Sequence, residues 1–265
     1  MIEAQEVALT KLGFRFGRNG PHAARTMMLN ELTTLLDGMP LESGLDDYAQ
    51  AVIDQNKLGK PTKKARELSL RHLTALYGLN PKLSLFRAFR LLWDADEAAR
   101  PVLALTAVLA RDPLLRCSLD FILAKQSGEA ITREDIERIL MSSNQDRFSP
   151  ASLKSFAQNI NGTWTQAGYL AGRSRKNRAL PVVRPANVAF CLFLGHLEGL
   201  SGQRLFSSSW ANLLGRSLDE LETLASAASY RGLLLFMNAG GVKEVRFPEY
   251  VATEEEQWRK EALNV

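Results

Sequence analysis

Apolar residues recur at steps of three and four along the first half of the chain, which is the spacing of one face of an α-helix. The pattern predicts helices over residues 21–36, 46–55, 61–78, 84–93 and 100–111. In the third of these, a proline stands just inside the start and a glycine at the end, the positions that favour these two residues. The last two are strongly apolar, which is typical of core helices. We therefore expect the first half of the chain to be an all-helical bundle.

Strand patterns are confined to the second half. Residues 179–183 (ALPVV) form a short apolar run, and residues 233–247 place two apolar stretches on either side of Asn238-Ala239-Gly240-Gly241. An Asn- and Gly-rich centre between such stretches is typical of a β-hairpin. The sequence therefore predicts a mainly α fold, made of two helical domains with helix-turn-helix or winged-helix character and a small C-terminal β-hairpin.

A polar loop at residues 142–148 (SSNQDRF) suggests where one domain ends and the next begins. We expect a helical N-terminal domain over residues 1–145, a winged-helix-like C-terminal domain over residues 146–250 and an acidic C-terminal tail over residues 251–265. Three consecutive glutamates, Glu254 to Glu256, mark this tail.

The central segment has the pattern of two helices joined by a tight turn. Ser149 and Pro150 suit the N-cap and first position of a helix over residues 149–160, and Asn161-Gly162 is a pair that commonly ends helices. A second helix would then begin at Thr163. The side chains expected to point outward from it are those of Thr163, Thr165, Gln166 and Tyr169. Thr and Gln on a recognition helix are common contacts to base edges or phosphates; the alternative is a pair of ordinary core helices.

The distribution of charge supports the DNA-binding interpretation of this segment. Residues 147–197 form a stretch of 51 residues without an Asp or Glu, where the overall acid content would place roughly five or six. The basic run RSRKNR follows the second predicted helix, where a winged helix carries its wing; the alternative is a solvated loop. An acid-free cationic surface suits a polyanion, because each contacted phosphate releases condensed counterions. The expected phosphate contacts are Lys154, Arg173, Arg175, Lys176 and Arg178.

A second, weaker cationic cluster surrounds the start of the third predicted helix. Lys60, Lys63 and Lys64 lie there. A helix N-terminus favours anions, so lysines at this place suit a phosphate. The same lysines are equally typical of a solubilising surface turn, and the sequence leaves both interpretations open.

Composition indicates a globular protein without recognisable catalytic machinery. Of 265 residues, 46% are hydrophobic and 23% charged, and the formal net charge is +4, as in ordinary soluble folds. The apolar runs are too short to span a membrane and the N-terminus lacks the features of a signal peptide, so we expect a cytoplasmic protein. The two cysteines and three histidines lack metal-ligand spacing, and no phosphate-binding loop or nucleophile elbow occurs. We therefore expect no enzymatic activity, cofactor or metal.

Four stretches carry a resemblance to a known family: RELSLRHLTALYGLNPKLSLFRAFRLLW, LALTAVLARDPLLRCSLDFIL, FSPASLKSFAQNINGTWTQAGYLAGRSRKNR and RGLLLFMNAGGVKEVRF. They resemble the BrxA family of BREX-type bacterial phage-defence systems and cover most of residues 65–247. The resemblance implies a non-enzymatic, predominantly helical DNA-binding protein that works beside larger ATPase, methyltransferase and phosphatase-like partners. Members of this family have also been labelled NusB-like, after an RNA-binding antitermination factor, or inner-membrane proteins, a label that the hydropathy argues against. This chain is somewhat long for the family, especially over residues 1–60, whose function the resemblance does not supply.

The leading hypothesis is a cytosolic accessory protein of a phage-defence system that binds double-stranded DNA. The alternatives are a protein-interaction adapter that docks a larger defence-complex subunit, and a NusB-like RNA-binding protein. A steep fall of duplex affinity with salt separates the first hypothesis from the second, and a preference for single-stranded RNA favours the third.

Overall fold

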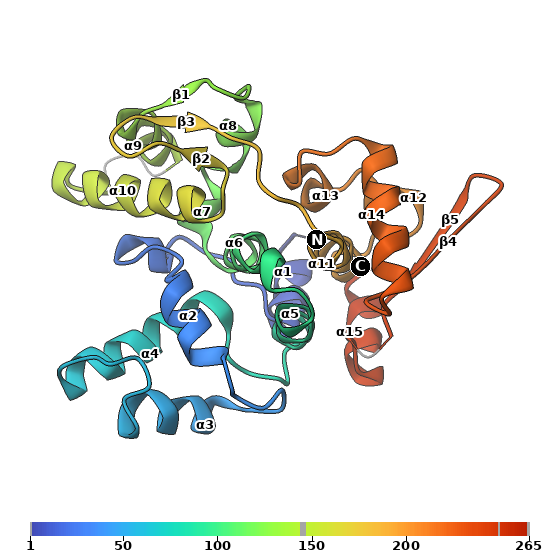
Figure 1. Ribbon diagram of the computed structural model, residues 1–265, viewed down its shortest axis with the longest axis horizontal. Helices are drawn as coiled ribbons and strands as arrows, with labels where there is room; N and C mark the ends of the chain where they lie inside the picture. The colour runs from blue at the N-terminus through green and yellow to red at the C-terminus, as the bar shows by residue number, and fades with distance from the viewer. Residues whose placement is uncertain (1, 144–146, 249, 264–265) are drawn as a thin grey trace. The chain divides into compact units, whose positions relative to one another are not determined.

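The computed structural model describes residues 2–143, 147–248 and 250–263, and the chain is mainly helical (Figure 1). Its contacts group into two compact units, each assembled from separate stretches of sequence. Unit 1 comprises Met1–Arg15, Leu83–Thr106 and Pro181–Val265, and unit 2 comprises Phe16–Lys82 and Ala107–Leu180.

The predicted domain ranges 1–145, 146–250 and 251–265 divide the chain differently from these two units, and they stay a prediction. The predicted boundary loop, residues 142–148, includes residues 144–146, which lie outside the described residues. The mainly α class and the C-terminal hairpin are confirmed.

Unit 1 is built around one buried helix. Its elements are α1 (Ile2–Leu12), α5 (Ser84–Ala95), the 3-10 helix η3 (Glu97–Ala99), α11 (Pro185–Leu197), α12 (Gln203–Phe206), α13 (Ser209–Leu213), α14 (Leu218–Tyr230), β4 (Leu235–Ala239), β5 (Val242–Arg246) and α15 (Thr253–Leu263), with the start of α6 (Arg100–Arg111). Helix α11 is apolar on every side and is buried over nearly its whole length. Phe190 in α11 packs against Phe89 in α5, with ring centroids 6.0 Å apart. Among the described residues, no helix is both long and apolar enough to cross a membrane.

The β4–β5 hairpin has the turn that its sequence predicts. Ala239 pairs with Val242, so Gly240 and Gly241 alone form the connection. Both glycines have positive φ, 59° and 85°, which is the backbone conformation that a two-residue hairpin turn requires. The inner side of the hairpin is fixed by Phe236, whose ring lies 5.4 Å from that of Phe206.

Unit 2 contains the remaining elements. They are the 3-10 helix η1 (Pro21–Ala23), α2 (Leu29–Leu36), α3 (Leu45–Ala49), the π-helix η2 (Gln50–Asp54), α4 (Lys63–Tyr77), α7 (Pro113–Arg116), α8 (Leu119–Ala124), β1 (Ala130–Ile131), α9 (Arg133–Ser143), α10 (Pro150–Gln166), β2 (Leu170–Ala171) and β3 (Lys176–Arg178), with the end of α6. Thr62 caps α4 by accepting a hydrogen bond from the Ala65 N–H, and Gly78 with φ 91° ends it, so the third predicted helix is confirmed.

The continuous helix predicted over residues 21–36 is wrong. The structure has the short η1, a non-helical segment and then α2. The reason lies in tertiary hydrogen bonds: the backbone N–H of His22 donates to Asp112, and that of Met27 to Thr163. These bonds hold the intervening segment out of helical geometry, which an apolar periodicity cannot reveal.

Candidate nucleic-acid interface

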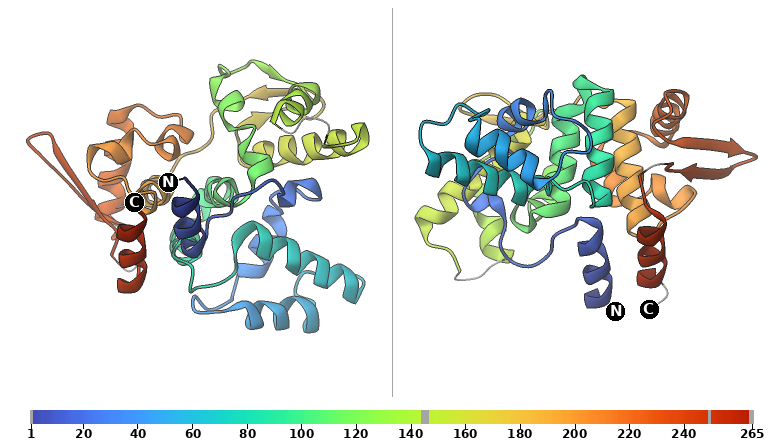
Figure 2. Two further views of the ribbon diagram at one scale, coloured as in Figure 1. Left: turned by 180° about the vertical axis from the view of Figure 1, so that it is seen from behind. Right: turned by 90° about the horizontal axis from the view of Figure 1, so that it is seen from below.

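Unit 2 contains a winged helix. The chain passes through α8, β1, α9, α10, β2 and β3, and the three strands form an antiparallel sheet in the order β1-β3-β2 (Figure 1). The left panel of Figure 2 shows this region from behind. Helix, strand, helix, helix and a terminal hairpin paired to the first strand is the winged-helix order, with the β2–β3 hairpin as the wing. The predicted winged-helix character is therefore present. Residues 179–183, predicted as a strand, form none; the strand of this region is β3, which ends at Arg178.

The helix pair that corresponds to the predicted helix-turn-helix lies one helix earlier than predicted, and residues 144–146 of its connection lie outside the described residues. The predicted break at Asn161-Gly162 is wrong, because α10 runs without interruption from Pro150 to Gln166. Packing keeps these two residues helical: Asn161 is buried, and a side chain at Gly162 would press against Thr26 at 3.0 Å. Gly168, with φ 81°, follows the helix end instead. The helix pair is thus α9 and α10. Helix α10 is the second helix of the pair, which is the position of the recognition helix in DNA-binding proteins of this type.

Thr163 is not an outward base contact. Its side chain is fully buried, and its hydroxyl oxygen accepts a hydrogen bond from the Met27 N–H at 2.9 Å. The same oxygen lies 2.7 Å from Nε2 of His22, whose Nδ1 lies 2.7 Å from the Asp112 carboxylate. Tyr169, also predicted outward, is fully buried against Trp164. Both predictions fail because α10 continues, which turns these positions toward the core.

The Asp112, His22 and Thr163 side chains stand in the order of a catalytic triad, but all three have zero exposure. No substrate can reach the Thr163 hydroxyl, so the arrangement is structural. Burial by itself would raise the pKa of Asp112, but His22 and the hydrogen bonds from backbone N–H groups lower it below its ordinary value. Asp112 also caps α7 through the Leu114 N–H at 2.9 Å. This network joins the N-terminal segment of unit 2 to the winged helix.

Arg178 is a second predicted nucleic-acid contact that the structure contradicts. The residue is only 6% exposed. Its guanidinium donates to the backbone oxygens of Ile122 at 3.1 Å and Tyr169 at 3.3 Å, and lies over the Tyr169 ring. Burial lowers the pKa of Arg178. A side chain held this way fixes the wing to α8 and cannot extend to a phosphate.

The other predicted residues of the winged helix remain accessible to different degrees. Lys154 is exposed on α10, and Arg173 and Arg175 are exposed in the turn of the wing. Lys176 is half-buried, with its ammonium donating to the Gly172 oxygen at 2.6 Å. Thr165 is half-buried and donates to its own helix, whereas Gln166 is exposed at the C-terminal end of α10.

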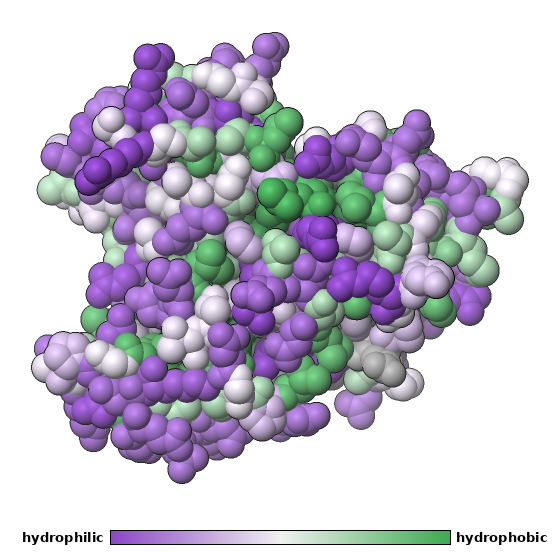
Figure 3. Space-filling view, viewed as in Figure 1, coloured by the Kyte–Doolittle hydropathy of each residue, from purple (hydrophilic) through white to green (hydrophobic). Residues whose placement is uncertain are grey.

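The turn of the wing has a fixed shape that presents its arginines. Gly172 has φ 105°, and a side chain there would lie 2.0 Å from the backbone oxygen of Arg175. Only glycine fits this close approach. Figure 3 shows that the surface over the wing and α10 is mainly hydrophilic.

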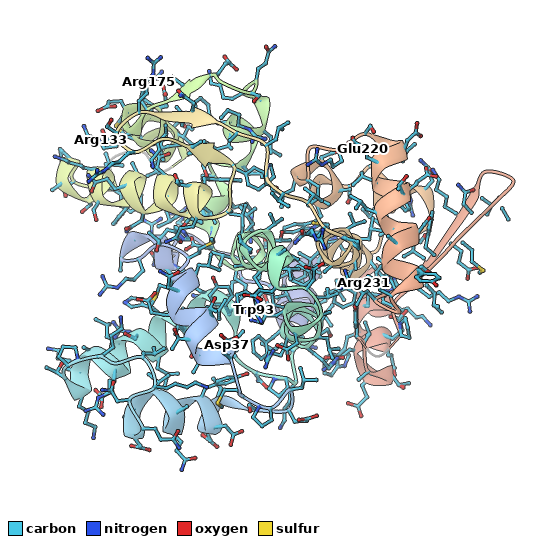
Figure 4. The ribbon with its side chains drawn as sticks, in the orientation of Figure 1. Asp37, Trp93, Arg133, Arg175, Glu220 and Arg231 are labelled. Carbon is cyan, nitrogen blue, oxygen red and sulfur yellow. The ribbon has the colours of Figure 1, made fainter. Side chains whose placement is uncertain are left out.

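A groove lies between the wing and α10. Its volume is about 730 Å³. The residues that line it come from β1, α9, α10, β3 and the loops beside them: Ala130, Ile131, Thr132, Arg133, Glu134, Gln158, Asn161, Gly162, Arg173, Ser174, Arg175 and Lys176. Figure 4 labels Arg133 and Arg175 in this region. Four of the lining side chains are cationic and one is acidic, so the groove favours an anion.

Gln158 was missed by sequence reasoning because the recognition helix was predicted to begin at Thr163, so no side chain of the first predicted helix, residues 149–160, was considered as a base contact. It is exposed on α10, one turn after Lys154, and lines the groove. Treating α10 as one recognition helix from Pro150 to Gln166 would have found it.

Arginines of the N-terminal segment were also missed. Arg147 donates to the Arg18 backbone oxygen at 2.7 Å, which places this segment beside the start of α10. Arg18 and Arg25 are exposed. The charge of Arg25 also acts on a histidine of α4: burial lowers the pKa of His72, and the positive charges of Arg25 and Arg71 lower it further. The acid-free sequence of residues 7–30 was the available signal.

The second predicted cluster lies on α4, outside the winged helix. Lys60 forms an ion pair with Glu31 at 3.0 Å, so its charge is partly compensated. Lys63 and Lys64 are exposed in the first turn of α4. A phosphate contact by Lys63 and Lys64 stays a prediction.

Among the described residues, no group of three or more His, Cys, Asp or Glu side chains could hold a metal ion. No protein-family model matches the chain, and no curated protein matches it significantly.

Proposed function

We propose that this protein is a non-enzymatic DNA-binding accessory protein that contacts duplex DNA through its winged helix. The observation that carries the proposal is that α10 and the wing expose Lys154, Arg173 and Arg175 on one winged helix. Helix α10 contains no acidic residue. Phosphate contacts supply most of the affinity, and Gln158 and Gln166 are exposed side chains on α10 that suit a base edge. Placement in a phage-defence system rests on the resemblance to the BrxA family alone.

The test is fluorescence anisotropy with labelled duplex DNA, single-stranded DNA and single-stranded RNA at two salt concentrations. We expect duplex affinity to fall steeply with salt. The variant Arg173→Ala/Arg175→Ala should bind all duplex sequences more weakly and lower the salt slope by about one for each lost phosphate contact.

The matched control removes two exposed cations outside the winged helix, Lys82 and Arg246. It should retain the parental salt slope. A wing variant that melts normally and binds duplex DNA like the parent would contradict the proposal. Tighter binding of RNA than of duplex would favour the RNA-binding alternative.

The adapter function is a second candidate because unit 1 exposes apolar side chains on its hairpin. Leu235, Met237 and Val242 are 49%, 55% and 74% exposed. In the register of β4 and β5 these residues share one side of the hairpin, opposite to Phe236. If this side docks another subunit, Met237→Lys should abolish that assembly in co-purification while leaving duplex affinity unchanged.

A further inference from the structure

The groove between the wing and α10 has features that duplex binding does not require. Its volume of about 730 Å³ lies within the range of small-molecule sites. A recognition helix and wing can contact a duplex from a convex surface, so an additional concave site between them points to a smaller ligand.

Two arginines at the groove are available to an external anion. No ion pair involves Arg173 or Arg175 among the described residues, and both are exposed. The other two cations have partners: Arg133 contacts Glu134 at 2.6 Å and Glu137 at 2.8 Å, and Lys176 donates to Gly172. An incoming phosphate therefore competes with no carboxylate for the wing arginines.

Asn161 supplies an independent indication of a ligand. It lines the groove, is only 7% exposed, and its side-chain oxygen accepts no hydrogen bond. An unpaired buried acceptor is unfavourable, and nearly all such groups in proteins have a partner. The N–H groups of a nucleobase are donors of the kind that this oxygen lacks. Gln158, which is exposed beside it in the groove, can donate and accept at the same base.

We propose that this groove binds a nucleoside phosphate, with Arg173 and Arg175 on the phosphate groups and Asn161 hydrogen-bonded to the base. Neither group alone selects this ligand, because the arginines can bind any polyphosphate and the Asn161 amide can bind any base. Together they favour a molecule that carries both. Because the wing arginines also serve the duplex, nucleotide and duplex exclude one another. This last consequence rests on the proposed function, whereas the nucleotide site itself does not.

The experiment is isothermal titration calorimetry of the full chain with three probes: ATP, adenosine and inorganic pyrophosphate. We expect ATP to bind more tightly than either fragment. Asn161→Leu preserves side-chain size, and should weaken ATP binding about fivefold, as expected for the loss of one hydrogen bond, while pyrophosphate binding stays unchanged. Arg173→Ala/Arg175→Ala should weaken ATP and pyrophosphate alike by more than about tenfold.

Lys154→Ala is the matched control, because Lys154 is an exposed cation of α10 that does not line the groove. It should leave ATP binding unchanged and weaken duplex binding, and thermal melting establishes that each variant is folded. Equal affinity for ATP and pyrophosphate, or parental ATP binding by Asn161→Leu, would overturn the nucleotide site. If ATP binds with the expected variant pattern while no duplex binds, the proposed function fails and the site stands. If the protein binds duplex DNA and ATP does not displace it, nucleotide and duplex do not exclude one another and that part of the proposal fails.

Discussion

Replacing Thr163 with valine tests whether this residue is a buried support or a contact to nucleic acid. Valine has nearly the same shape but no hydroxyl, so two buried groups lose their partner: the Met27 N–H, 2.9 Å from the oxygen, and Nε2 of His22, at 2.7 Å. Each buried polar group left unpaired costs about 1–3 kcal/mol. Since valine fills nearly the same volume as threonine, the two unpaired groups set the effect, and we expect Thr163→Val to lower the free energy of unfolding by about 2–6 kcal/mol.

The assay is urea denaturation followed by circular dichroism, with duplex affinity measured under conditions where the variant is folded. Thr165→Val is the control, because its hydroxyl donates only to the backbone oxygen of Asn161 in its own helix and the residue is half-buried. It should change stability by less than about 0.5 kcal/mol. A Thr163→Val protein as stable as the parent would refute the argument, and one that is stable but loses sequence preference would restore Thr163 as a base contact.

Arg178→Ala should lower the free energy of unfolding by about 2–4 kcal/mol, because the Ile122 and Tyr169 carbonyls lose a buried donor. Urea denaturation measures this change, and a variant as stable as the parent would show that the Arg178 side chain is not held in the interior. Gly172→Ala should weaken duplex binding although every arginine remains, since a side chain at φ 105° and 2.0 Å from the Arg175 oxygen forces the wing turn to change; Gly240→Ala, with open space around it, is the control. Because the pKa of Asp112 is lower in the folded protein, its ionised carboxylate stabilises the fold, and this effect is fully present at pH values above the unfolded pKa of about 3.8. This stabilisation should be lost as pH falls through the lower folded pKa, so the free energy of unfolding measured from pH 5 to pH 2.5 should decline less in Asp112→Asn than in the parent.

Much of the fold could be predicted because local signals and tertiary packing agree. The α4 helix has its cap at Thr62 and its stop at Gly78, and the hairpin turn has the two glycines that its geometry needs. Where the predictions failed, a contact distant in sequence decided the local structure. Asp112 and Thr163 are 90 and 136 residues from the backbone groups that they hold. No periodicity within residues 21–36 contains that information.

The Asn161-Gly162 pair shows the same conflict on the scale of one turn. Both residues favour the end of a helix, but the buried side of α10 continues through Ile160, Thr163 and Trp164. Burial of these positions outweighs a cost of about 1 kcal/mol for a glycine within a helix. One misplaced turn then assigned Thr163 and Tyr169 to the wrong side, and it placed the predicted recognition helix after Gln158.

The acid-free stretch at residues 147–197 consists of two parts that lack acidic residues for different physical reasons. Its first part covers α10 and the wing, where Lys154, Arg173 and Arg175 are exposed and the absence of acids leaves their charge uncompensated. Its last part is α11, which is buried in unit 1, where acids are absent because an unpaired carboxylate cannot be buried cheaply. The length of the stretch therefore overstates the cationic surface. The few exposed cations of the winged helix are therefore what favours an anionic partner, and their removal tests the proposal.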